Sequence, residues 1–130
     1  SIAAKSIKPE ISVIGAEPEL ADDAYRSLKA GSIQPVLRTD TVADGLRTSL
    51  GSLTFQIISE KLDDIITVSE KSIINNLRSV CERMKIIVEP SSVVALSATL
   101  DGNLNAEGKK IGIIFTGGNI DLDNLPWNKV

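Results

Sequence analysis

The chain has 130 residues, of which 42% are hydrophobic and 24% are charged, and this is enough to build the core of one ordinary domain. Its net charge of −3 argues against a nucleic-acid partner, which normally needs a basic face. No apolar run approaches the roughly 20 residues that span a bilayer, so we expect a soluble chain without a membrane partner.

The residue types exclude several kinds of active site. The chain has no histidine, which removes Ser-His-Asp and Cys-His chemistry and the usual metal ligand. Cys81 is the single cysteine, so an internal disulfide and a multi-cysteine zinc site are excluded as well. Catalysis would therefore depend on a cofactor, a metal ion with oxygen ligands, or another segment of polypeptide.

Predicted helices and short apolar strands alternate in the first half of the chain. We expect helices over about residues 1–7, 20–30 and 53–62, and buried strands over 11–16 and 64–68. Pro9 stops the first helix, and Gly31 is suited to the C-cap of the second. Residues 32–52 have no clear period and are expected to be mostly irregular.

The second half contains the clearest helix. Ser69 is a good N-cap, and the apolar residues that follow it share one helical face to about Lys85. Pro90 then starts another helix of about ten residues. A polar turn leads to a third predicted strand over 110–115, which is closed by Thr116-Gly-Gly-Asn119.

These elements predict an α/β fold, specifically part of a doubly wound, mainly parallel sheet in a three-layer arrangement. The strands are continuous apolar runs separated by helices, which is typical of a parallel sheet covered on both faces. Only three strands are expected, whereas such sheets usually have about five or six. The first helix also begins without a cap or a preceding strand. We therefore expect residues 1–130 to be a single partial domain, truncated at its N-terminus.

Four segments, in order, resemble serine racemases and the related serine/threonine dehydratases. They are residues 16–24 (AEPELADDA), 41–49 (TVADGLRTS), 82–90 (ERMKIIVEP) and 115–122 (FTGGNIDL). The resemblance covers nearly the whole chain and implies a fold-type II, tryptophan synthase beta-like enzyme that uses pyridoxal 5′-phosphate (PLP). Residues 1–130 would be the C-terminal portion of its PLP-binding large domain.

The resemblance also implies a reaction: racemisation of serine, or β-elimination that dehydrates and deaminates serine or a related β-hydroxy amino acid. The first two segments favour the serine racemase and hydroxyaspartate dehydratase branch over threonine deaminases, and a threo-3-hydroxyaspartate or threonine dehydratase is the alternative. In this family the PLP-binding lysine and the glycine-rich phosphate loop lie upstream. We therefore assign no catalytic residue here, expect the N-terminal remainder to supply them, and expect the isolated chain to be inactive.

By resemblance, Thr116, Gly117, Gly45 and Glu89 contact the cofactor. Thr116 follows a predicted strand, at the end where open α/β sheets bind ligands, and matches a hydroxyl residue that hydrogen-bonds the pyridine nitrogen. Glycine at positions 45 and 117 would allow close approach of the backbone. Beyond Glu89, the sequence Ser91-Ser92-Val93 stands where many relatives have Gly and Ala, which leaves the local pocket shape open.

Acidic residues cluster where the first predicted strand turns into a helix. By resemblance, the Glu17 carboxylate, the Ala21 backbone carbonyl and the Asp23 carboxylate form a site for Mg²⁺, Mn²⁺ or Ca²⁺, cations that prefer oxygen ligands. The ion would be structural or activating and remote from the chemistry. Acids also favour a helix N-terminus without any metal, so the residues alone leave both readings open.

Lys85 and Asn119 match positions that bind nucleotide between subunits in animal serine racemases, so ATP is a candidate effector. A solvated lysine at a helix C-terminus is the simpler explanation of Lys85. By resemblance, the whole enzyme would be a cytoplasmic homodimer that acts on a small amino acid. The alternative from a different class is a non-catalytic small-molecule-binding module that uses the turn Thr116–Asn119.

Overall fold

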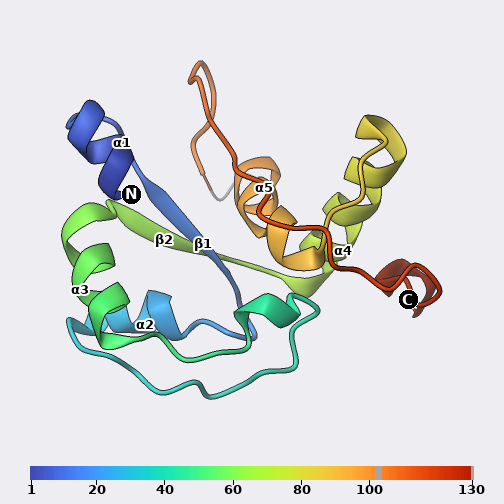
Figure 1. Ribbon diagram of the computed structural model, residues 1–130, viewed down its shortest axis with the longest axis horizontal. Helices are drawn as coiled ribbons and strands as arrows, with labels where there is room; N and C mark the ends of the chain where they lie inside the picture. The colour runs from blue at the N-terminus through green and yellow to red at the C-terminus, as the bar shows by residue number, and fades with distance from the viewer. Residues whose placement is uncertain (102–103, 130) are drawn as a thin grey trace.

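A computed structural model describes residues 1–101 and 104–129 of the chain. At its centre is a two-stranded parallel sheet (Figure 1), in which β1 (Ile14–Pro18) pairs with β2 (Asp64–Val68). The register places Ile14 opposite Asp64. Short, largely apolar runs suit parallel strands because both of their faces are buried. Both strands were predicted, and the first starts three residues later than expected.

Helices cover this sheet from two sides. α2 (Asp23–Ala30) contacts β2 and α3 (Ser52–Lys61), while α5 (Val94–Leu100) contacts both strands. Figure 1 shows α2 and α3 on one side of the strands and α5 on the other. The short α1 (Ile2–Ile7) packs against α3. Helices on both sides of a parallel sheet confirm the predicted α/β class.

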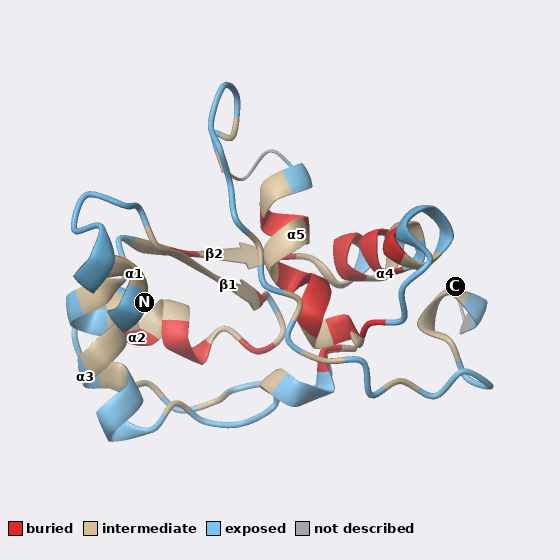
Figure 2. Ribbon diagram, turned by 45° about the horizontal axis from the view of Figure 1, so that its top comes forward, coloured by how far each residue is buried: buried red, intermediate tan, exposed pale blue. Residues whose placement is uncertain are grey.

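The main core lies where α4 (Glu70–Ser79) packs against α5 and the end of β2. The side chains of Ile73 and Leu77 are fully buried there, and Val68 and Val93 pack with them. In Figure 2 the buried residues gather on α4, on α5 and on the segment that precedes α5. The segments that pack on this core are therefore held in place by buried apolar contacts.

Local signals explain both ends of α4. The Ser69 hydroxyl accepts a hydrogen bond from the Ser72 backbone N–H at 3.3 Å, which is the predicted N-cap. At the other end α4 continues into a π-helical turn, η2 (Val80–Met84), which ends at Lys85. Lys85 has φ of 59° and is the one non-glycine residue with positive φ in the described part of the chain. The predicted extent of this helix is confirmed, but its last turn is π-helical and not α-helical.

The chain enters α5 through a 3₁₀ turn, η3 (Pro90–Val93). Pro90 occupies the first position, where a backbone N–H would have no helical partner, and η3 passes directly into α5. The segment between α2 and α3 is irregular as predicted, apart from the short turn η1 (Asp44–Leu46). A final turn, η4 (Pro126–Lys129), closes the described chain. No helix within residues 1–101 and 104–129 is long and apolar enough to cross a membrane.

The third predicted strand, over residues 110–115, is wrong. This segment has no regular secondary structure, and the sheet formed by the described residues contains only β1 and β2. Its Ile111 and Ile114 side chains are exposed. A strand exists only where a neighbour completes its hydrogen-bond ladder, and here the segment lines a groove of about 420 Å³ together with β1 and α5. The apolar pattern identified an extended segment but could not identify its partner.

Candidate functional site

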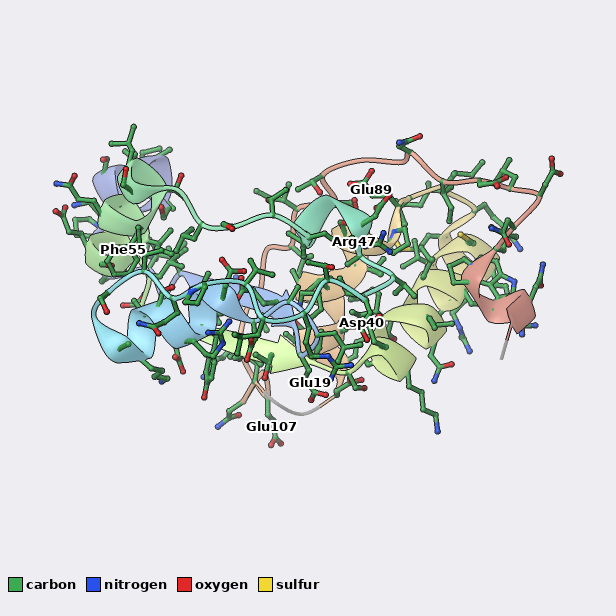
Figure 3. All side chains as sticks on the ribbon, turned by 90° about the horizontal axis from the view of Figure 1, so that it is seen from below. Glu19, Asp40, Arg47, Phe55, Glu89 and Glu107 are labelled. Carbon is green, nitrogen blue, oxygen red and sulfur yellow. The ribbon has the colours of Figure 1, made fainter. Side chains whose placement is uncertain are left out.

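Three segments far apart in the sequence meet beside the start of α5, and we call them the loop cluster: Asp44–Gly45, Glu89–Ser92 and Thr116–Asn119. η1 and η3 contact each other; Figure 3 labels Arg47, directly after η1, and Glu89, directly before η3. Backbone and side-chain hydrogen bonds join the third segment to the second. All four predicted cofactor contacts, Thr116, Gly117, Gly45 and Glu89, lie in this cluster.

The hydroxyl of Ser92 is the main link between η3 and the turn that follows residue 115. It donates a hydrogen bond to the Gly117 carbonyl oxygen at 2.7 Å and accepts from the backbone N–H groups of Thr116 at 3.1 Å and Gly117 at 2.8 Å. Its oxygen also lies 3.3 Å from Thr116 Oγ1. Ser92 is buried, whereas Thr116 is exposed. Ser92 was not predicted as a site residue.

Glu89 holds the same turn from the other side. Its backbone N–H donates to the Gly117 carbonyl oxygen at 3.0 Å, and its carboxylate accepts from the Asn119 backbone N–H at 3.2 Å. A Cβ atom on residue 117 would lie 2.8 Å from Glu89 Oε2 and 2.9 Å from Glu89 Cδ. With the carboxylate in this position, residue 117 has no room for a Cβ atom.

The Asp44–Gly45 segment joins the cluster through Ser91. The Gly45 backbone N–H donates to Ser91 Oγ at 3.1 Å and also to Asp44 Oδ1 at 2.9 Å. A Cβ atom on residue 45 would lie only 2.9 Å from Ser91 Oγ. Glycine thus allows residue 45 to approach Ser91 closely. The predicted approach of Gly45 to the cofactor stays a prediction.

A small polar cleft of about 230 Å³ adjoins the loop cluster. Its lining includes Asp44, Arg47, Asn119 and Asp121. Arg47 is fixed there because its Nη2 and Nε donate to the Thr41 carbonyl oxygen at 2.7 Å and 3.1 Å. Of the two predicted nucleotide-binding residues, Asn119 lines this cleft, whereas Lys85 lies at the end of η2 and does not.

The three predicted metal ligands form a second group, the acidic cluster, at the end of β1. The Glu17 carboxylate accepts hydrogen bonds from the backbone N–H groups of Tyr25 at 2.7 Å and Ala24 at 3.3 Å. Asp23 is 3% exposed, and its Oδ2 accepts from the Leu50 backbone N–H at 2.9 Å. Buried Ala21 lies between them in sequence, and none of the described residues donates a hydrogen bond to its carbonyl.

The surroundings of Glu17 disfavour the charged form of its carboxyl group. Burial raises the pKa of its carboxyl from 4.5 to about 7; the hydrogen bond from Tyr25 opposes the increase, and the negative charge of Asp23 adds to it. Within residues 1–101 and 104–129, no three His, Cys, Asp or Glu side chains are grouped to hold a metal ion by themselves. A cation here would use the two carboxylates, the Ala21 carbonyl and water, which is a donor set suited to a hard ion.

Comparison with known proteins identifies the family. Residues 1–117 match the family described as "Pyridoxal-phosphate dependent enzyme". The chain belongs to this family. It is 49% identical over 128 residues to a serine racemase of Dictyostelium discoideum, with 95% of this chain and 40% of the relative covered. It is 45% identical over 123 residues to a β-hydroxyaspartate dehydratase of Paracoccus denitrificans, with 95% and 39% covered.

A solved structure of maize serine racemase shares the fold, with a TM-score of 0.89 and 41% identity over 98% of this chain and 40% of that one. The predicted family and the predicted fold-type II architecture, present here in part, are therefore confirmed. The chain spans about two fifths of the length of the curated relatives it matches.

The loop cluster fits the cofactor of this family in one respect. The exposed Thr116 hydroxyl is a neutral hydrogen-bond donor and acceptor, which suits a ring nitrogen. The space beside Gly45 and Gly117 is occupied by Ser91 and Glu89. The resemblance identified these positions from short motifs. It did not select Ser92 as a site residue, although Ser92 stands in the segment that departs from the Gly and Ala of many relatives.

Proposed function

We propose that the protein containing this chain uses PLP to racemise serine, or to dehydrate and deaminate serine or a related β-hydroxy amino acid. The observation that carries the proposal is the loop cluster itself. It brings Thr116, Gly117, Glu89 and Gly45 together from three distant segments, in a chain that is 49% identical to a serine racemase.

Thr116 is proposed to hydrogen-bond the pyridine nitrogen. When bound, PLP supplies an electron sink for the substrate's Cα. A threonine hydroxyl can donate a hydrogen bond to an unprotonated nitrogen. Unlike a carboxylate, it carries no negative charge that would stabilise the protonated nitrogen. The resulting moderate electron withdrawal suits proton movement at Cα and loss of a β-hydroxyl. Thr116 thus influences the reaction type without transferring a proton to the substrate.

The other members of the loop cluster shape the wall beside the ring. Gly117 and Gly45 let backbone approach where a Cβ atom would collide with Glu89 or Ser91. Glu89 holds the turn by accepting from Asn119 and donating to the Gly117 carbonyl oxygen. These contacts hold the turn that carries the Thr116 hydroxyl.

The acidic cluster is proposed to bind Mg²⁺, Mn²⁺ or Ca²⁺ through the Glu17 carboxylate, the Ala21 carbonyl and the Asp23 carboxylate. Three features support it: the raised pKa of Glu17, the burial of Asp23, and the Ala21 carbonyl without a donor among the described residues. A divalent cation would relieve the repulsion between the two carboxylates. None of the hydrogen bonds described for the acidic cluster reaches the loop cluster, so the role of the ion would be activating or structural.

The lysine that binds PLP is proposed to come from further polypeptide, which would also occupy the groove between β1, α5 and residues 109–113. The matched relatives, about two and a half times as long as this chain, support this proposal. We further propose a cytoplasmic homodimer, with Lys85 and Asn119 contributing to an ATP effector site. Residues 1–130 alone, supplied with PLP, are expected to show no turnover of serine; measurable racemisation or deamination would contradict this division of roles.

A dehydratase acting on threo-3-hydroxyaspartate is the second candidate. It is favoured by the 45% identity to the β-hydroxyaspartate dehydratase of Paracoccus denitrificans. Assays of the complete protein on serine, threonine and hydroxyaspartate, each followed for inversion at Cα and for keto acid release, distinguish the two candidates.

Replacing Thr116 tests the proposal directly. In the complete protein, Thr116→Ala should retain the fold but lower kcat about tenfold, since a lost hydrogen bond of about 1.4 kcal/mol corresponds to a factor of ten. The absorption spectrum of bound PLP should shift as well. Thr54→Ala, on the exposed surface of α3, is the matched control and should change neither. Unaltered kinetics and spectrum in Thr116→Ala would refute the role of this hydroxyl.

A further inference from the structure

The hydroxyl of Ser92 makes an unusual number of contacts with two consecutive residues. It lies within 3.3 Å of four atoms: the backbone nitrogen and Oγ1 of Thr116, and the backbone nitrogen and carbonyl oxygen of Gly117. Ser92 is 2% exposed, so water does not compete for these contacts. Its hydroxyl therefore connects η3 to a turn that is 24 residues away in sequence.

The hydrogen-bonding capacity of this hydroxyl is fully used by the backbone. A serine hydroxyl has one proton to donate and two lone pairs to accept with. The proton goes to the Gly117 carbonyl oxygen at 2.7 Å, because a carbonyl can only accept. The lone pairs receive the N–H groups of Thr116 at 3.1 Å and Gly117 at 2.8 Å, which can only donate.

The proton of the Thr116 hydroxyl is consequently not used in a hydrogen bond to Ser92. Its oxygen is 3.3 Å from Ser92 Oγ, which is long for a bond between two hydroxyls. Ser92 has no lone pair left to accept that proton and no second proton to give. The Thr116 Oγ–H is therefore available to an acceptor outside the protein, while the backbone that carries it is held at three points.

We propose that Ser92 is the positioning residue of the cofactor site: it anchors the backbone of Thr116 and Gly117 and keeps the Thr116 hydroxyl proton free for the PLP ring nitrogen. This role rests on the proposed function, because it names the residue on which the hydroxyl's orientation depends. Ser92 acts through Thr116 and need not touch the cofactor.

Comparison with Ser97 separates this role from ordinary packing. Ser97 is equally buried, but its hydroxyl donates to the Val93 carbonyl oxygen one turn back and accepts from Asn76 Nδ2 on α4. Ser97 thus connects α4 with α5 inside the core and makes no contact with the turn at 116–117. Ser97→Ala is a matched control because it removes a buried hydroxyl from the same part of the chain.

The test uses Ser92→Ala in the complete protein, with three readouts. Amide hydrogen exchange at Thr116 and Gly117 should become faster by about tenfold or more, and this readout does not require PLP. PLP affinity should fall by about tenfold, and the absorption spectrum of bound PLP should shift. Ser97→Ala should lower the thermal unfolding temperature while leaving all three readouts unchanged.

A double replacement decides whether Ser92 acts through Thr116. In a Thr116→Ala background, adding Ser92→Ala should change the PLP spectrum little further, because the oriented hydroxyl is already gone. If Ser92→Ala shifts the PLP spectrum as much in the Thr116→Ala background as in the unaltered protein, the positioning role is overturned. Unchanged amide hydrogen exchange and unchanged PLP affinity in Ser92→Ala would overturn it too. If the unaltered complete protein fails to bind PLP, the proposed function fails with it; normal binding that is insensitive to Ser92→Ala refutes this inference alone.

Discussion

The loop cluster and the acidic cluster are held by different forces. In the loop cluster, a neutral hydroxyl from Ser92 joins backbone N–H and carbonyl groups of Thr116 and Gly117. In the acidic cluster, the half-buried Glu17 and the buried Asp23 are carboxylates that accept backbone hydrogen bonds and repel each other. The first arrangement depends on close fit, and the second depends on charge. The two should therefore respond to different perturbations.

A test of close fit comes from Gly117→Ala in the complete protein. The added Cβ would lie 2.8 Å from Glu89 Oε2, so the carboxylate would have to leave the Asn119 N–H. The carboxylate can turn away, so the cost is the lost hydrogen bond, about 0.5–1.5 kcal/mol, which corresponds to up to about a tenfold loss of PLP affinity. Gly51→Ala is the control, because its Cβ would meet only Thr54 Oγ1, at 3.9 Å. Equal PLP affinity in both variants would show that close fit does not govern the loop cluster.

Charge in the acidic cluster is tested by Asp23→Asn. The amide oxygen can still accept from the Leu50 N–H, so the fold should survive while the negative charge is lost. The Mg²⁺ concentration that gives half-maximal activation of the complete protein should rise about tenfold or more, with PLP affinity unchanged. Asp22→Asn serves as the control, since Asp22 pairs with Arg26 at 2.8 Å and is no predicted ligand. An unaltered Mg²⁺ requirement would argue against the site.

The pH dependence of stability should come from the acidic cluster. The pKa of Glu17 is about 7 in the folded protein against 4.5 normally, so the protonated carboxyl favours folding. This contribution is fully present below 4.5 and is lost as the pH rises through 7. Without divalent cations, stability to denaturant should fall between about pH 5 and pH 8, and Glu17→Gln should weaken that decline. Mg²⁺ should stabilise the folded protein more strongly at about pH 8 than at about pH 5, because Glu17 is then ionised. Equal stabilisation at the two pH values would contradict cation binding by Glu17.

The parts of the fold that the sequence predicted are those with strong local signals. β2 was placed at 64–68 and α4 was placed after Ser69, because an apolar run, a capping serine and a helical apolar face lie next to one another. The segment 110–115 has an equally apolar pattern but is not a strand, because a strand depends on a neighbour that its own residues do not specify.

In the candidate site, too, the residues with local sequence signals could be predicted and those that depend on distant contacts could not. Thr116, Gly117, Gly45 and Glu89 could be selected because each stands in a short motif that resembles a known family. Ser92 could not, because its importance arises from four atoms 24 and 25 residues away, and a serine near a helix start is common. Motifs identify the residues that face the ligand more readily than those that hold them in place.

Ser91 provides the finest test of how the loop cluster is held. Its hydroxyl accepts from the Gly45 N–H at 3.1 Å, but the same N–H also donates to Asp44 Oδ1 at 2.9 Å. In Ser91→Ala the Gly45 N–H therefore keeps one acceptor. In contrast, Ser92→Ala removes the one side chain among the described residues that bonds Thr116 and Gly117. Ser91→Ala should therefore reduce the free energy of PLP binding by about 0.5–1 kcal/mol, which is a two- to fivefold loss of affinity. A Ser91→Ala effect as large as that of Ser92→Ala would mean that both loops, rather than the turn at 116–117 alone, set the position of the cofactor.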